Sequence, residues 1–148
     1  RCKSGKSMAD IAITVSSVQA GTAATIRGGT AGATITAGQP VYLDSAASNA
    51  VKPARANGAT TAAAVGIALN GASSGQPVDY VTKDDDFTLG GTSTAGIILC
   101  VSAATAGNIA PSADMTTGNY VTTLGVMKSA TKAKIYASSI TQSGVAKA

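Results

Sequence analysis

The sequence predicts an all-β fold: a compact β-sandwich or barrel-like domain built from two similar β units, with an extended N-terminal arm. Thr, Ser, Gly and Val are frequent and Glu is absent, which favours strands and turns over helices. Short segments alternate apolar with small residues, and this period of two turns one face of a strand toward a core. Two parts of the chain also resemble each other at a nearly constant offset, which is typical of a duplicated unit.

Length and composition describe one domain with a thin core. The chain has 148 residues, which is the size of a single domain. Ala, Gly, Ser and Thr make up more than half of it, whereas Leu, Ile, Val and Phe together stay below one fifth. Such a low apolar share indicates disorder when it accompanies a high net charge, but the net charge here is only +4. We therefore expect a folded, lightly packed β protein that gains stability from binding partners.

The segment 64–78 has the pattern of a strand, a turn and a second strand. Apolar residues alternate over 65–69, and the Asn-Gly dipeptide at 70–71 tolerates the positive φ of a tight turn. The string Gly-Gln-Pro-Val then starts the second strand at 75–78, because proline fits the first residue of a strand. The same string stands at 38–41, which is a first sign of internal repetition.

A longer match relates the segment 37–69 to the segment 95–127. The offset is 58 residues at the start of the match (Ala95 minus Ala37) and 59 residues near its end. A constant offset across several landmarks argues against chance matches in a low-complexity chain. We therefore predict that the two segments are pseudo-repeats that form similar β units.

The remaining strand predictions rest on alternation or on apolar runs. The run 97–101 is the most apolar, so we expect a strand buried on both faces. Cys100 should lie inside it as a reduced, small apolar residue without a disulfide to Cys2. Further strands are expected at 41–43, 51–53, 77–81, 120–127 and 133–137.

The part of the chain before the repeat is expected to be separate from it. We divide the chain into an N-terminal tail, strand and arm at 1–33 and a β domain at 34–148. Ile11, Ile13 and Val15 alternate and predict a first strand. A strand at a chain end needs a partner edge for its N–H and C=O groups, so we expect it to dock on a neighbouring molecule.

The segment 18–32 allows three interpretations. With Arg27 in its middle, it fits a strand with loose ends, an arm that adds to a neighbour's sheet edge, or a flexible loop. The residues that we expect to contact a neighbour are Met8, Ile11, Ile13, Val15 and Arg27.

Two charge clusters have both a functional and a structural interpretation. Lys83 is followed by three aspartates at 84–86, which offer carboxylates to Ca²⁺ but lack the alternate spacing of a known loop. A solvated turn is therefore the preferred interpretation. Lys128, Lys132 and Lys134 are the densest basic group, for which nucleic-acid binding competes with the protection of an exposed strand edge.

The side chains that catalysis requires are scarce. The chain has no His and no Glu, no ligand spacing of a zinc site and no nucleophile-elbow motif. The string at 5–7, Gly-Lys-Ser, lacks the upstream glycine and strand of a phosphate-binding loop. Basic residues are dispersed among few aromatics, and no run of about 18 apolar residues occurs. We therefore expect that the protein is not an enzyme and that it has no cofactor and no metal site. We also expect no direct contact with nucleic acid and no membrane partner.

Six strings between residues 34 and 136 mark turns and strand starts. They are AGQPVYLD at 37–44, VGIALN at 65–70, GQPV at 75–78, IAP at 109–111, TGNYV at 117–121 and LGV at 124–126. In these strings the chain resembles the capsid decoration (cement) and head-fibre-type structural proteins of tailed phages. The resemblance implies a β-rich domain on the outside of an icosahedral head, often a trimer over capsomer junctions, and it implies no catalytic residues.

The function that this resemblance implies is structural. We expect a virion protein, made in the bacterial host cytoplasm, that lies on the outer capsid surface and bridges subunits of the major capsid protein. A homo-oligomer is expected, with a trimer as its preferred state. The alternative is a β-rich receptor- or carbohydrate-binding module of a phage fibre, which the scarcity of aromatic residues disfavours.

Overall fold

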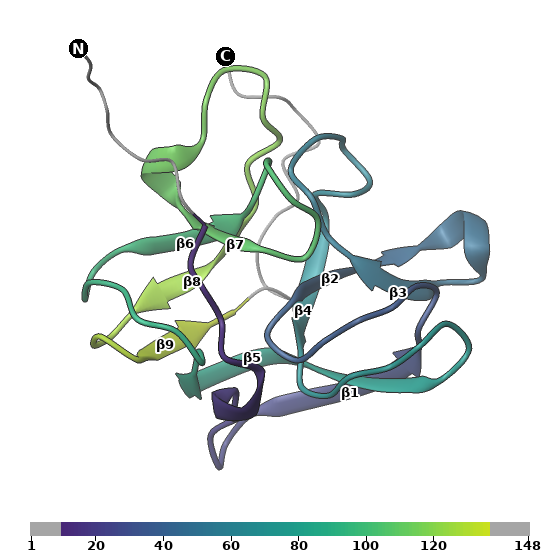
Figure 1. The fold of residues 1–148 in the computed structure, drawn as a ribbon, viewed down its shortest axis with the longest axis horizontal. Helices are drawn as coiled ribbons and strands as arrows, with labels where there is room; N and C mark the ends of the chain where they lie inside the picture. Colours follow the sequence, from purple (N-terminus) through teal and green to yellow (C-terminus); the bar gives the residue numbers. More distant parts are fainter. Residues whose placement is uncertain (1–9, 137–148) are drawn as a thin grey trace.

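The computed structural model describes residues 10–136, and most of their regular structure is strand (Figure 1). The strands are β1 (Thr25–Thr30), β2 (Pro40–Asp44), β3 (Ala50–Pro53), β4 (Ala64–Ala68), β5 (Pro77–Thr88), β6 (Ile98–Val101), β7 (Ile109–Pro111), β8 (Thr123–Met127) and β9 (Lys132–Ile135). Three single-turn 3₁₀ helices accompany them: η1 (Val15–Ser17), η2 (Ser45–Ala47) and η3 (Ser112–Asp114). All strand pairs are antiparallel, so the prediction of an all-β, barrel-like domain is confirmed. The described range forms no helix with the length and apolar character needed to cross a membrane.

Two four-stranded sets are joined through one long strand. Strands β3, β2, β4 and β5 lie side by side in that order, and strands β7, β6, β8 and β9 repeat it. The twelve-residue β5 joins the sets, because it pairs with β4 near its middle and with β9 along its second half. Figure 1 shows the two curled sheets side by side, joined at β5. We name the first set unit one and the second set unit two.

The units repeat the register of their strands as well as the order. Val41 pairs with Gly66, Leu99 pairs with Gly125, and a β-bulge follows each pair. A Cβ atom at Gly66 would collide with a carbonyl oxygen of β5, and one at Gly125 would collide with a carbonyl oxygen of β9. Both glycines are therefore required by the close approach of the next strand. The equivalences follow the sequence offsets, since Leu99 minus Val41 is 58 and Gly125 minus Gly66 is 59.

The string Gly-Gln-Pro-Val builds the same turn twice. Gly38 and Gly75 both have a φ of +91°, a left-handed value that glycine adopts without strain. The side-chain oxygen of Gln39 accepts a hydrogen bond from the backbone N–H three residues earlier at 3.1 Å, and that of Gln76 does the same at 2.7 Å. Proline then starts β2 and β5. The repeated string is thus a signal for the start of a strand.

The N-terminal segment 10–31 runs along one edge of β5, while β4 and β9 pair with the opposite edge. It contacts both units. Gln19 bridges the last residue of β5, and β1 pairs with the first half of that strand. Upstream, the N–H of Ile11 donates to a carbonyl of β7 at 2.8 Å. Downstream, Ala31 bridges β3. One continuous segment therefore touches the outermost strand of each unit.

The first strand predicted at 11–15 is wrong. The N–H groups of Ile11 and Thr14 donate to two different places, β7 and the loop after β5, so no ladder forms. Val15 starts η1 instead. The strand of this region is β1, which realises the strand interpretation of the segment 18–32.

Both charge clusters lie in or beside paired strands, contrary to the sequence interpretation. Residues 83–86 belong to β5 rather than to a solvated turn. Lys132 and Lys134 belong to β9, which lies between β5 and β8 and is not an exposed edge. These predictions failed because β5 and β9 pair with each other across the chain, which the pattern within either segment does not reveal.

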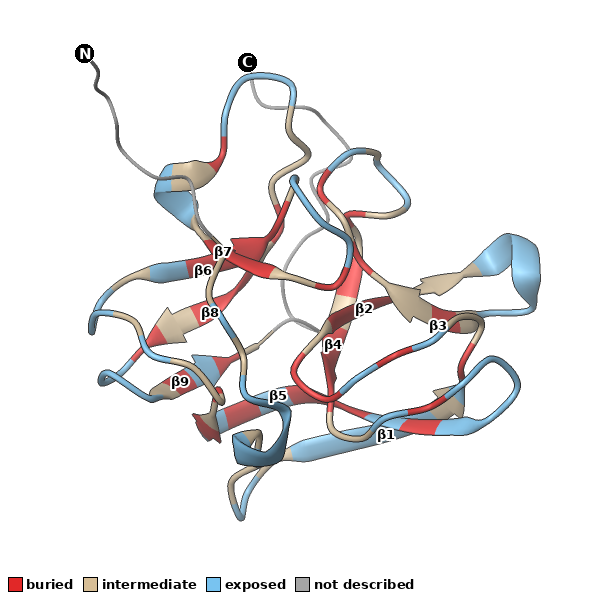
Figure 2. Ribbon diagram, in the orientation of Figure 1, coloured by how far each residue is buried: buried red, intermediate tan, exposed pale blue. Residues whose placement is uncertain are grey.

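Two hydrophobic clusters fill the domain (Figure 2). The larger cluster joins the two units and contains the fully buried Phe87, Leu99 and Ile135. The smaller one lies within unit one. Val41 and Tyr42 are neighbours on β2 and belong to different clusters, so this strand is covered on both faces. Figure 2 shows buried residues along the strands of both units, whereas β1 is mostly exposed.

Candidate functional site

The five predicted contact residues have different surroundings. Met8 lies outside the described residues. Ile11 and Ile13 are half-buried and pack against the core of their own chain. Val15 is 48% exposed, Arg27 is exposed on β1, and the two line different hollows. Of the described four, only Val15 and Arg27 are exposed, and contact with a neighbour stays a prediction.

A carboxylate that the sequence did not single out holds the start of the N-terminal segment. Asp10 accepts a hydrogen bond from the hydroxyl of Ser102 at 2.7 Å and another from the side-chain amide of Asn108 at 2.8 Å. Its partners lie 92 and 98 residues away in the sequence, so no local pattern could have identified them. Further along, Gly90 and Gly91 of the loop after β5 let the N-terminal segment lie close to this loop. A Cβ atom at either glycine would press on a backbone carbonyl oxygen of the N-terminal segment.

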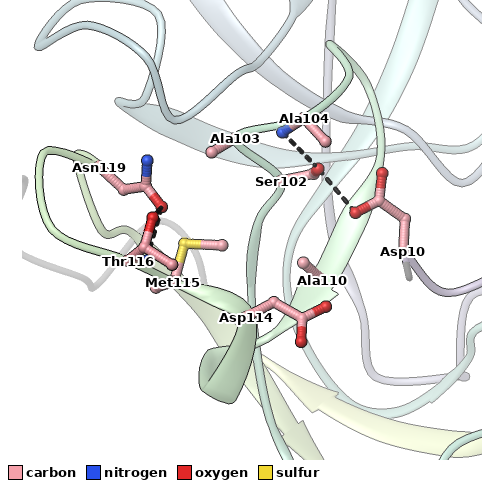
Figure 3. A pocket seen from close by; sticks show the side chains of 9 residues that line it. All are labelled: Asp10, Ser102, Ala103, Ala104, Ala110, Asp114, Met115, Thr116 and Asn119. Carbon is pink, nitrogen blue, oxygen red and sulfur yellow. Dashed lines mark hydrogen bonds between the residues drawn. The ribbon is translucent and has the colours of Figure 1, made fainter. Parts of the chain in front are cut away.

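A hollow of about 270 Å³ opens beside Asp10, and we name it the acidic hollow (Figure 3). Its lining consists of two carboxylates, small apolar residues and neutral polar groups: Asp10, Ser102, Ala103, Ala104, Ala110, Asp114, Met115, Thr116 and Asn119. Neither carboxylate forms an ion pair with a described residue. The Oδ2 atom of Asp114 is buried and has no hydrogen-bond partner among the described residues. The hollow is therefore suited to a positively charged group with an apolar stem.

A second hollow, of about 320 Å³, lies at one end of unit one. It is lined by Arg27 of β1, Leu43 of β2, Val65 of β4, and Tyr80 and Thr82 of β5. We name it the open end. Leu43 and Val65 are half-buried and pack on the smaller hydrophobic cluster, which also contains Tyr80. The open end thus combines an apolar floor with one guanidinium group.

The basic and acidic clusters of the sequence face each other across β5 and β9. Lys128 and Lys132 place their ammonium groups 3.4 and 3.5 Å from the two oxygens of Asp86. Lys134 lies 3.9 Å from Asp85. The charge of Lys132, aided by a hydrogen bond from Lys128, lowers the pKa of Asp86. The carboxylates therefore partly neutralise the positive charge of the three lysines, which weakens the case for a nucleic-acid contact at this cluster.

Formal charges balance within the described range. All seven aspartates of the chain lie between residues 10 and 136, whereas four of its eleven basic residues lie outside this range. The remaining seven bases (11 minus 4) cancel the seven acids, so the net charge of +4 comes from Arg1, Lys3, Lys6 and Lys147. Residues 10–136 thus carry no net positive charge for a polyanion.

Cys100 is fully buried and unpaired, as predicted. Burial raises the pKa of its thiol to about 11, although a hydrogen bond with Thr123 acts in the opposite direction. A thiol that stays protonated in a core is a poor nucleophile. In this strand Cys100 acts as a small apolar residue.

The described groups are suited to contacts with another molecule. They form an acidic hollow, a hollow with one arginine and an exposed strand, β1. Among the described residues, no three His, Cys, Asp or Glu side chains gather in a way that could hold a metal ion. No family model matches the chain, and no curated protein matches it.

Proposed function

We propose that this chain is a structural virion protein that decorates the outer surface of a tailed-phage head. It stabilises the head by bridging subunits of the major capsid protein, and it acts as a homo-oligomer, with a trimer as the expected state. In this role the protein supplies binding energy that must be lost before neighbouring capsid subunits separate.

The observation that carries the proposal is the position of the residues behind the phage-family resemblance. The turns at 38–41 and 75–78 fix the starts of β2 and β5. Gly66 and Gly125 lie where the next strand passes closest. The resemblance thus falls on residues that fix the strands of this domain, and the proposal rests on that resemblance.

The shape of the domain is compatible with a bridging role. Paired strands and a core that joins both units make one packed body. Outside this core, β1 and the open end present side chains to solvent. Weak contacts through such surfaces, repeated over a capsid lattice, add up through multivalency.

Carbohydrate binding by a fibre module is the second candidate function, and the burial of the tyrosines disfavours it. Sugar sites commonly offer exposed aromatic faces, but Tyr42 and Tyr80 are buried, and Tyr120 and Tyr136 are half-buried. Phe87 is fully buried as well. The described residues therefore present no fully exposed aromatic platform.

Binding to heads tests the proposal directly. Purified protein is mixed with expanded, DNA-free heads of the phage that encodes the chain and then sedimented. We expect saturable co-sedimentation with a fixed number of copies per head, and a higher temperature of head disruption in the presence of the protein. Light scattering of the free protein reports whether it is a trimer.

Heads of an unrelated phage serve as the control and should not bind the protein. If the protein stays in the supernatant with its own heads and leaves their disruption temperature unchanged, the proposed function is wrong. Binding to host envelope glycans in the same preparation would favour the fibre-module alternative.

A further inference from the structure

The open end of unit one differs from the equivalent end of unit two. Leu43 pairs with Val51 as Val101 pairs with Ile109, so Leu43 and Val101 occupy the same place in their units. Leu43 is only half-buried, whereas Val101 is fully buried. The same end is therefore covered in one unit and left partly open in the other.

Two further equivalent pairs show the same contrast. Val65 and Leu124 both stand at the β-bulge of their unit, and Val65 is half-buried while Leu124 is fully buried. Counting from the strand pairs of β4 and β8, Thr82 of β5 corresponds to Ile135 of β9, which is fully buried. Unit one thus has a hydroxyl and two half-exposed aliphatic side chains where unit two has a closed apolar layer.

Arg27 stands at the rim of this end on the same face. It pairs with Tyr80 across β1 and β5, and paired residues of antiparallel strands point to the same side. Arg27 is exposed and forms no ion pair with a described residue. Its charge is therefore available to a carboxylate from another molecule.

The edge of β1 next to Arg27 has no strand partner in the described range. β1 pairs with β5 on one side only. On the other side, β3 reaches the chain at Ala31, where it bridges Val51. The backbone groups of residues 25–28 on that side are left for an added strand.

We propose that the open end binds an extended segment of the partner protein that pairs with residues 25–28 of β1. A carboxylate of that segment lies opposite Arg27, and an aliphatic side chain two residues away enters the hollow between Leu43 and Val65. Side chains two residues apart on a strand point to the same face, so one segment satisfies both contacts. Identification of the partner as the major capsid protein rests on the proposed function.

Titration with designed peptides tests the site without capsids. The probes are two blocked pentapeptides, acetyl-Thr-Val-Thr-Asp-Thr-amide and its counterpart with Asn in place of Asp. We expect the Asp peptide to shift the amide resonances of Arg27, Val65 and Thr82 in ¹⁵N-labelled protein. The Asn peptide should bind roughly two- to fivefold more weakly, the scale of an exposed ion pair.

Variants of two basic residues distinguish a specific contact with Arg27 from a nonspecific effect of the protein's positive charge on binding of the Asp peptide. Arg27→Gln should weaken the Asp peptide to the level of the Asn peptide. Lys83→Gln is the matched control, because Lys83 is an exposed base on the same strand, β5, and does not line the open end. This control should bind the Asp peptide like the unchanged protein. Absence of shifts at the open end with millimolar peptide, or equal loss in both variants, overturns the proposal.

A head-binding experiment with Arg27→Glu and Lys83→Glu links the site to the proposed function. If only Arg27→Glu loses head binding, the result supports both the site and the decoration function. If the unchanged protein and both variants bind equally well, the decoration function stands and the site is wrong. If the Asp peptide binds at the open end but the unchanged protein does not bind heads, the site stands and the capsid is not its partner.

Discussion

At the scale of single residues, a few small side chains decide the fold. Gly66 and Gly125 allow a neighbouring strand to cross at a distance that any Cβ atom would prevent. Cys100 fills a place in the core where a thiol is tolerated because it stays protonated. A chain with few large apolar residues depends on such close approaches for its packing.

Gly125→Ala should be strongly destabilising. The added methyl group meets a carbonyl oxygen of β9, so the two strands must separate, at a cost of about 1–3 kcal/mol or more. Urea denaturation followed by circular dichroism measures the loss. Gly71→Ala is the control, because its added Cβ would lie 3.6 Å from the nearest heavy atom, an ordinary contact. Equal stability of both variants would contradict the packing argument.

Stability should fall at high pH because of Cys100. Burial raises the pKa of its thiol from 9.0 to about 11, so above pH 9 the unfolded chain releases a proton that the folded chain retains. Release of this proton favours unfolding, so the stability contribution is full below pH 9 and is lost between about pH 9 and 11. The expected loss reaches roughly 1–3 kcal/mol.

Comparison with Cys100→Ala isolates this effect from the titration of tyrosines and lysines. The difference in unfolding free energy between the two proteins should change between pH 8 and pH 11 in favour of the variant. A difference that stays constant over this range would mean that the thiol ionises as easily in the folded protein as in the unfolded one.

At the scale of elements, the start of the N-terminal segment, residues 10–14, is held by a few anchors. Its backbone donates to β7 and to the loop after β5, and Asp10 accepts two side-chain hydrogen bonds. These anchors lie at two places in the chain, one at residues 102–109 and the other at Gly90. Residues 10–14 are therefore attached at points, whereas β1 later in the segment pairs with β5 as a ladder, and loss of one anchor should loosen residues 10–14 locally.

Asp10→Ala should release the start of this segment. The change leaves the hydroxyl of Ser102 and the amide of Asn108 without their shared acceptor, at a cost of about 1–3 kcal/mol. Hydrogen exchange of the Ile11 and Thr14 amides should accelerate. Amides of β8 report global unfolding, so their exchange should accelerate only as far as the lower free energy of unfolding of the variant accounts for. Asp79→Ala, at an exposed carboxylate, is the matched control and should leave exchange unchanged. Unaltered protection of Ile11 in Asp10→Ala would show that the carboxylate does not anchor the segment.

The elements that could be predicted are those whose pattern lies within one segment. Alternation over 65–69 and the apolar run 97–101 led to β4 and β6 with nearly correct bounds. The strand predicted at 11–15 failed because its backbone partners are on two distant segments. The aspartates at 84–86 were assigned to a turn because their lysine partners on and beside β9 follow more than 40 residues later.

The candidate site shows the same limit. Arg27 could be singled out because it is a lone base in a small-residue segment. The open end could not be predicted, since Leu43, Val65 and Tyr80 come from three strands and meet only after the sheet curls. The acidic hollow depends in the same way on a contact between Asp10 and Ser102.

At the scale of the whole molecule, the two units are related but not independent. They repeat strand order and register, yet β5 of unit one pairs with β9 of unit two, and the larger hydrophobic cluster contains residues from both units. A unit separated from its neighbour would lose a strand partner and one side of its core. The two units therefore form one body with a shared core, for which we expect cooperative unfolding.

Unfolding should accordingly proceed in a single transition. Circular dichroism and the reactivity of Cys100 toward a thiol reagent, both followed in urea, should have the same midpoint, because β6 cannot open without the shared core. Separate expression of residues 1–90 and 91–148 should yield unfolded chains. Two resolved transitions, or a folded fragment, would show that the units are stable by themselves.

The position of the N-terminal segment also has a consequence for synthesis on the ribosome. Residue 11 is made before its backbone partner on β7, which follows 98 residues later (109 minus 11). At bacterial and eukaryotic elongation rates this interval lasts roughly 5–20 seconds. Unit one can pair its strands during that time, whereas the contact of residue 11 with unit two must wait until β7 is made. Residue 11 thus finds its backbone partner later than the strands of unit one find theirs, and a nascent neighbour meets this residue while it still lacks that partner.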